Sequence, residues 1–265
     1  MLKTMISSRF APFFLAWALL GGMPAALANE GAQGPRFALP IDCVPGASCF
    51  VQNYVDHDPS PAWRDYACGA RTYDGHDGTD FRVPSMAAVR AGVAVLAAAD
   101  GVVAGVRDGM ADVSFRETGK EAVKDRECGN GLLLRHADGW ETQYCHLAQG
   151  SVAVRRGQAV RPGERLGLVG LSGLTEFPHL HLTIRHKGKA VDPFAPAPVA
   201  GACGSEQTLW DAATAQALAY RRRVLLNHGF SDRALTMAEV ENLPPDAARP
   251  NGQSSALVAW VRMIG

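Results

Sequence analysis

Two histidines separated by one residue, His179 and His181, lie in a segment with the pattern of a β-strand. Leu180, Leu182 and Ile184 alternate with polar residues there. Since alternate side chains of a strand share a face, both imidazoles point the same way. Such a pair is either the solvated polar face of an edge strand or part of a metal site, and the pair alone does not decide between these readings.

A second candidate pair lies in the segment DGHDGTDF, residues 74–81. His76 and Asp80 are four residues apart with Gly78 between them. In an extended chain both side chains lie on one face, and both types bind zinc, although surface loops often contain such a pair. Together with one strand histidine the pair provides three protein ligands. A fourth position then stays open for water, as hydrolytic zinc sites require, and the other strand histidine lies close enough to act on that water.

A third segment, WETQYCHL over residues 140–147, adds His146. It forms half of an apparent hairpin that turns at Ala-Asp-Gly. Because neighbouring residues of a strand point to opposite faces, Cys145 is expected to face away from a cleft that His146 faces. Cys128 lies at the start of the partner strand. We therefore predict a Cys128–Cys145 disulfide that fixes the strand carrying His146.

These three segments, in this order, resemble the signature motifs of the lysostaphin/LytM-type zinc metallopeptidases, a family that cleaves peptide stems or cross-links of bacterial peptidoglycan. GHDGTDF resembles the family's His-x-x-x-Asp motif, YCHL its Tyr-x-His-Leu segment and PHLHL its His-x-His strand. The glycine- and valine-rich run over 151–173 is similar to the family's spacer between the last two motifs. The resemblance covers residues 73–194, about half of the chain that remains after export.

The resemblance also implies roles for individual residues. His76, Asp80 and His181 match the ligands of one zinc ion, and His146 and His179 match the catalytic histidines. Without a His-Glu-x-x-His helix, imidazoles must position or deprotonate the attacking water and stabilise developing charge. The partner implied is the peptide part of peptidoglycan.

The sequence departs from the family pattern beside the His-x-His strand. Glu176 and Phe177 replace a small residue and a glycine, and Leu182 and Thr183 stand where Phe and Glu are common. These positions affect the substrate groove or the residues that orient the ligands. Two aromatic side chains near the motifs, Tyr73 and Tyr144, either line that groove or pack in the core.

Three functions fit these residues. The first is an exported zinc metalloendopeptidase acting on peptidoglycan. The second is a non-catalytic wall-binding or regulatory module that activates other wall hydrolases, as some relatives that have lost their ligands do. All five positions are filled here, which favours the enzyme. The third, a zinc DD-carboxypeptidase of an unrelated type, pairs His and Asp with a distant Glu and His, so it is least favoured.

The first 28 residues have the pattern of a secretory signal peptide. Lys3 and Arg9 flank a polar start, an apolar run follows, and Ala-Leu-Ala ends at Ala28, where we expect cleavage. An uncleaved anchor is the alternative, but the apolar run is short for a span of about 20 residues. The protein is therefore expected in the periplasm or outside the cell, without a membrane span after cleavage.

Composition excludes some partners. Cleavage leaves 237 residues with 24 basic and 26 acidic side chains and no basic patch, which argues against nucleic acid or an anionic membrane surface as partner. An even number of cysteines in an exported chain indicates disulfides. Besides Cys128–Cys145, we expect Cys49 to pair with Cys68. The sequence does not indicate the oligomeric state or the bond that is cut.

The chain after the signal peptide divides into four regions, which must position the candidate site residues. Residues 29–72 form a loop-rich, disulfide-bearing lead-in. Residues 73–194 are mainly β, because short apolar runs alternate with glycine turns, and we expect an antiparallel, sandwich-like domain. Residues 195–204 form a linker. Residues 205–265 are expected to be a helical extension, with one helix capped by Ser205 and ended by Gly229, a second begun by a Thr236–Glu239 capping box, and a last strand.

Overall fold

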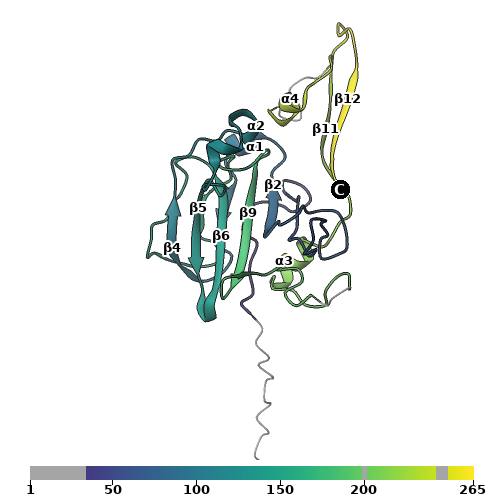
Figure 1. Ribbon diagram of the computed structural model, residues 1–265. Coiled ribbons are helices and arrows are strands. Elements are labelled where there is room, and N and C mark those ends of the chain that lie inside the picture. The colour runs from purple at the N-terminus through teal and green to yellow at the C-terminus, as the bar shows by residue number, and fades with distance from the viewer. Residues whose placement is uncertain (1–33, 199–201, 243–249) are drawn as a thin grey trace, which may run out of the picture. The chain divides into compact units, whose positions relative to one another are not determined.

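The computed structural model of the chain describes residues 34–198, 202–242 and 250–265 (Figure 1). The expected signal peptide, residues 1–28, and residues 199–201 of the expected linker lie outside the described residues. Eight strands form the main sheet: β1 (Phe50–Val51), β2 (Thr79–Arg82), β4 (Gly101–Arg107), β5 (Asn130–Arg135), β6 (Trp140–Leu147), β7 (Ala159–Val160), β9 (His179–His186) and β10 (Lys189–Ala190).

Their order is β1-β2-β9-β6-β5-β4-β7, with β10 paired to β9, and every pairing is antiparallel. Two smaller sheets pair β3 (Ala94–Leu96) with β8 (Arg165–Leu168) and β11 (Val224–Ser231) with β12 (Val258–Ile264). The helices are short: α1 (Met86–Ala91), α2 (Phe115–Thr118), α3 (Ala212–Ala217) and α4 (Met237–Asn242), with 3-10 turns η1 (Lys120–Val123) and η2 (Ala137–Gly139). The predicted mainly β, antiparallel fold is confirmed.

The apolar face of β9 lies at the centre of the core. Leu180, Leu182 and Ile184 are buried in one apolar cluster with Val95 of β3 and Leu166 of β8. The core thus connects the main sheet with the β3–β8 sheet, which is the expected sandwich-like arrangement. Because side chains alternate along a strand, the opposite face of β9 is left for its polar residues.

Two disulfides fix the lead-in, and they differ from our prediction. Cys49 pairs with Cys43 and Cys68 pairs with Cys203, so the expected Cys49–Cys68 bond is wrong. A turn over 44–48, closed by backbone hydrogen bonds, brings the Cα atoms of Cys43 and Cys49 to 5.9 Å. The Cys68–Cys203 bond spans 135 residues and ties the expected linker to the lead-in. No local pattern could have indicated such a distant partner.

The C-terminal region is less helical than its spacing predicts. The helix expected from Ser205 to Gly229 is reduced to α3, which is capped by the carboxylate of Asp211 bonding Thr214 N at 2.7 Å. Residues 224–231 form strand β11 instead, paired along its length with β12. A partner strand some 30 residues away thus overrides the local helical pattern.

The second helix of this region follows the prediction. Thr236 Oγ1 accepts from Glu239 N, and the Glu239 carboxylate accepts from Thr236 N at 2.8 Å, so the capping box that begins α4 is confirmed. No described helix is both long and apolar enough to cross a membrane.

A buried ion cluster joins this C-terminal region to β2. Glu241 of α4 forms ion pairs with Arg82 of β2 and Arg262 of β12, and Arg262 also donates to the carbonyl of Pro84. The three charged side chains are 6–18% exposed. A single carboxylate therefore compensates two largely buried guanidinium groups.

We expect Glu241→Ala to lower the free energy of unfolding by about 3 kcal/mol, because it leaves two buried cations without a counter-charge. Urea unfolding measures the loss, and Glu206→Ala, which removes an exposed carboxylate, is the control. A Glu241→Ala protein as stable as this control would contradict the role of the cluster.

Candidate metal centre

Strand pairing brings the predicted metal ligands to one face of the main sheet. Asp80 of β2 lies directly opposite His181 of β9, and Arg82 lies opposite His179. Residues directly opposite each other in an antiparallel pair share a face. His76 lies in the turn just before β2, where its backbone N–H donates to the Tyr73 carbonyl. The pairing thus supplies what the sequence alone could only suggest, a common face for two distant segments.

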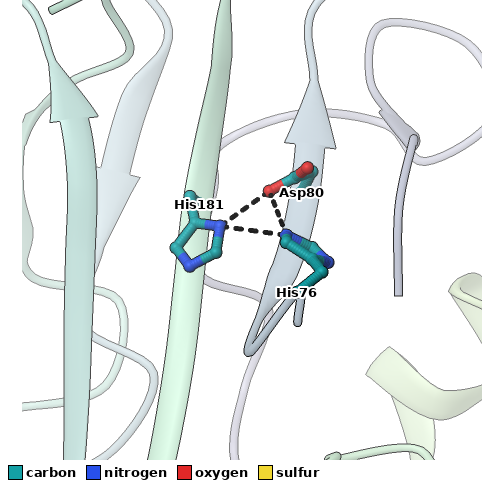
Figure 2. Close-up of side chains that lie close together, drawn as sticks. All are labelled: His76, Asp80 and His181. Atoms are coloured by element: carbon teal, nitrogen blue, oxygen red, sulfur yellow. Dashed lines mark hydrogen bonds and ion pairs between the residues drawn. The ribbon is translucent and has the colours of Figure 1, made fainter. Parts of the chain in front are cut away.

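The donor atoms of three residues converge on one point (Figure 2). His76 Nε2 lies 3.2 Å from Asp80 Oδ1 and 3.2 Å from His181 Nδ1, and the last two atoms are 2.8 Å apart. Tetrahedral zinc ligands at about 2.0–2.1 Å from the ion are about 3.3 Å from one another. The type, number and spacing of these donors therefore fit a zinc ion.

Contacts from the lead-in orient two of the donors. His76 Nδ1 donates to the Tyr54 carbonyl at 2.7 Å, which leaves the Nε2 lone pair directed at the other ligands. Asp80 Oδ2 accepts from the amide of Asn53 at 2.7 Å, which leaves Oδ1 for the same purpose. Such contacts fix ligand geometry before any ion binds.

The ring of His181 rests against a residue without a side chain. A Cβ atom on Gly78 would lie 2.6 Å from His181 Nε2 and 2.7 Å from the Leu182 carbonyl. Only glycine at this position lets the turn after His76 pass so close to β9.

The charges at the centre favour cation binding. Burial by itself would raise the pKa of Asp80, but His76 and His179 beside it hold that pKa well below its usual range. Burial would lower the pKa of His181, but the hydrogen bonds that its ring donates to the carboxylates of Asp77 and Asp80 outweigh this effect and raise the pKa to about 9. The ionised carboxylate of Asp80 thus lies beside the imidazole of His181, which binds a proton more tightly than usual. A divalent cation would compete with the proton on His181 for the same site.

His146 reaches this face through a break in the strand pattern. Leu132 pairs with Tyr144 and Asn130 pairs with Leu147, so two residues of β6 lie opposite the single Gly131. This is a β-bulge, and His146 within it has a left-handed backbone with φ of 64°. Regular alternation would have turned His146 toward the core beside Tyr144.

The same register corrects the expected direction of Cys145. It lies directly opposite His181 and so faces the site side of the sheet, not away from it. The predicted Cys128–Cys145 disulfide is nonetheless confirmed, and it fixes the bulge from which His146 projects.

The two remaining histidines lie beside the triangle of donors. The rings of His146 and His179 are 4.7 Å apart, and His179 Nε2 lies 3.3 Å from Asp80 Oδ1. His146 Nδ1 donates to the Ser172 carbonyl at 2.8 Å and His179 Nδ1 to that of Phe177 at 2.9 Å. Burial, with His179 and His181 nearby, holds the pKa of His146 well below its usual range. Its environment thus disfavours the protonated ring, and its Nε2 is free of the Ser172 contact.

The structure also places the other residues that lie near the motifs. Tyr144 packs in the core, where its hydroxyl accepts from Ala98 N, whereas Tyr73 is exposed with its ring 4.5 Å from that of His76. Asn53 and Tyr54 could not be predicted from the motifs, because the lead-in that contains them lies outside the motifs. His57 of the lead-in pairs with Asp192 at 2.7 Å.

Comparison with known proteins agrees with this geometry. Residues 74–193 match the model of peptidase family M23. The cell division protein DipM of Caulobacter vibrioides is 36% identical over 124 residues, which are 44% of this chain and 17% of that protein. The peptidoglycan DD-endopeptidase ShyB of Vibrio cholerae is 31% identical over 133 residues, 50% of this chain and 26% of that protein.

A crystal structure of a zinc-containing peptidase from Vibrio cholerae is also similar, at 25% identity, with a TM-score of 0.35 over 54% of this chain and 39% of that one. The chain spans about a quarter or less of the length of the two curated relatives. The match to the family model includes the four histidines and the aspartate described above.

Proposed function

We propose that this chain, whose residues 74–193 match the model of peptidase family M23, is a zinc-dependent endopeptidase that hydrolyses peptide bonds in the stems or cross-links of bacterial peptidoglycan. The observation that carries the proposal is the triangle formed by His76 Nε2, Asp80 Oδ1 and His181 Nδ1 (Figure 2), with two further imidazoles beside it. These five residues have the types and the arrangement that metal-assisted hydrolysis requires.

In this proposal His76, Asp80 and His181 hold one zinc ion. A zinc ion in such a site acts as a Lewis acid that polarises a carbonyl oxygen and makes a water molecule more acidic. His146 and His179 carry the remaining tasks, which are to take the proton from the attacking water and to stabilise the charge that develops on the carbonyl oxygen. Backbone carbonyls accept from the Nδ1–H of each ring, which leaves the Nε2 atom of each ring for these tasks; that of His179 lies 3.3 Å from Asp80 Oδ1.

Several features support a cell-envelope substrate. ShyB, a relative of this chain, is named as a peptidoglycan endopeptidase. All six cysteines are paired in disulfides, which persist outside the reducing cytoplasm. We therefore propose export to the periplasm or beyond, directed by the signal peptide expected over residues 1–28.

Digestion of purified peptidoglycan tests the proposal. We expect the zinc-loaded protein to release fragments with new amino and carboxyl termini at peptide bonds, detected by mass spectrometry. A chelator should stop the release and added zinc should restore it. Zinc-loaded protein that cuts no bond would contradict the enzyme and favour the regulatory module that activates other hydrolases.

A further inference from the structure

The imidazole of His181 has a second nitrogen that lies outside the donor triangle. In Figure 2 its Nδ1 takes part in the dashed contacts, while Nε2 points away from His76 and Asp80. Nε2 lies 3.0 Å from Thr183 Oγ1 and 3.4 Å from Asp77 Oδ1. Two oxygen atoms thus surround the nitrogen that does not face the other ligands.

The carboxylate of Asp77 is itself fixed in place. Arg185 Nη2 donates to Asp77 Oδ2 at 3.1 Å, and Arg185 Nη1 donates to the side chain of Gln143 at 2.7 Å. Thr183 Oγ1 also lies 3.4 Å from Asp77 Oδ1, at a distance where it can donate to the carboxylate. The two residues that follow His181 on the same face of β9 therefore both contact Asp77.

A neutral imidazole carries one proton, and the partner of the protonated nitrogen determines which nitrogen has the lone pair. An acceptor at Nε2 keeps the proton there and leaves the Nδ1 lone pair free for a cation. It also fixes the rotation of the ring. The contacts of Asp77 and Thr183 meet both requirements, since Thr183 can accept from the ring and donate to the carboxylate.

We propose that Asp77 is a positioning residue for the metal centre: together with Thr183 it accepts the Nε2–H of His181 and so directs Nδ1 toward His76 and Asp80, while Arg185 holds the carboxylate in place. This inference rests on the proposed function, because it takes His181 as a zinc ligand. It adds three residues from outside the set that the motif resemblance identified.

The competing explanation is a surface ion pair. The side chain of Asp77 is 48% exposed and that of Arg185 is 25% exposed, and exposed pairs contribute little to stability. An ion pair of this kind would leave zinc affinity unchanged when it is removed. A positioning residue would change zinc affinity while leaving the stability of the metal-free protein nearly unchanged.

The test measures the zinc dissociation constant of full-length protein by competition with a chromophoric chelator. We expect Asp77→Ala to weaken zinc binding roughly 10- to 100-fold, the usual cost of removing a residue that orients a ligand. Asp77→Asn, whose amide oxygen can still accept from Nε2, should retain more affinity. Asp74→Ala removes the same charge from an exposed position three residues away and should bind zinc like the wild type.

A second comparison tests the role of Arg185. Arg185→Gln alone should weaken zinc binding, but it should add little in the Asp77→Ala background, because it acts through the same carboxylate. The absorption bands of the cobalt-substituted protein should shift in Asp77→Ala and not in Asp74→Ala. Thermal unfolding of the metal-free variants shows that each one is folded.

Zinc affinity of Asp77→Ala within twofold of the Asp74→Ala control would overturn the inference, even if the wild type is an active peptidase. A wild type that binds zinc but cuts no peptidoglycan would contradict the proposed function. The zinc affinities of the Asp77 and Asp74 variants would still test the inference about Asp77. A wild type without zinc affinity would overturn both.

Discussion

Replacing His181 with alanine is expected to abolish zinc binding and peptidoglycan cleavage together. His181 supplies one of three donor atoms that lie within 3.2 Å of one another, and the described chain brings only three such donors together as a candidate metal group. Losing a ligand should cost more than losing a residue that orients one, so we expect zinc affinity to fall more than roughly 100-fold. Metal content after dialysis and chelator competition measure this loss.

His186→Ala is the matched control for this variant. His186 lies at the other end of β9, where its ring stacks on Trp140 at 4.4 Å and contacts the Asp138 carbonyl. The same substitution on the same strand should leave zinc binding and cleavage unchanged. If His181→Ala keeps zinc as well as His186→Ala does, then His181 is not a ligand.

Replacing His179 with alanine should separate metal binding from catalysis. His179 Nε2 lies beside Asp80 but is not part of the donor triangle, so we expect most of the zinc to remain. Loss of a group that transfers a proton or stabilises charge typically lowers kcat by about 10²- to 10⁴-fold. Zinc content and cleavage rate measured on the same sample give both quantities.

His146→Ala should behave in the same way, since its ring lies 4.7 Å from that of His179 and 6.0 Å from that of His181. If both histidines act in one chemical step, the double variant should be only slightly slower than either single variant. Full activity in both single variants, or loss of zinc from both, would refute the roles proposed for them.

The structure also indicates what the C-terminal region does for the fold. Glu241 compensates Arg82, and Arg82 in turn lies over the ring of Phe177 at 4.4 Å. The ring centre of Phe177 lies 4.7 Å from that of His179. Phe177 is also one of the positions where the sequence departs from the family pattern. Glu241, which lies outside the family match, thus helps through Arg82 to hold the side chain of Phe177 next to the site.

Much of the candidate site could be predicted from local patterns. The alternation of leucine and histidine predicted that His179 and His181 share one face of a strand. This could be predicted because the side chains of a strand alternate with a period of two, a pattern that is visible within the segment itself. The spacing of His76 and Asp80 and the order of the three motifs indicated which residues would meet. The capping box of α4 was readable for the same reason, since its partners are three residues apart.

Other features depend on which segments pair, and no local pattern encodes that. His146 faces the site only because β6 has one residue more than β5 at Gly131, and alternation alone would have turned it away. Residues 224–231 are a strand because β12 is available to pair with them, although their spacing is typical of a helix. The partner of Cys68 lies 135 residues away in the sequence.

The sequence by itself therefore determined the chemistry: which imidazoles and which carboxylate are present, and that alternation along β9 directs two of them to one side. The tertiary structure decided how precisely they meet. The register of β2 against β9 sets Asp80 opposite His181, Tyr54 and Asn53 from the lead-in orient the donors, and Asp77 contacts the far side of His181. These are contacts between distant segments, and their geometry exists only after the sheet has formed.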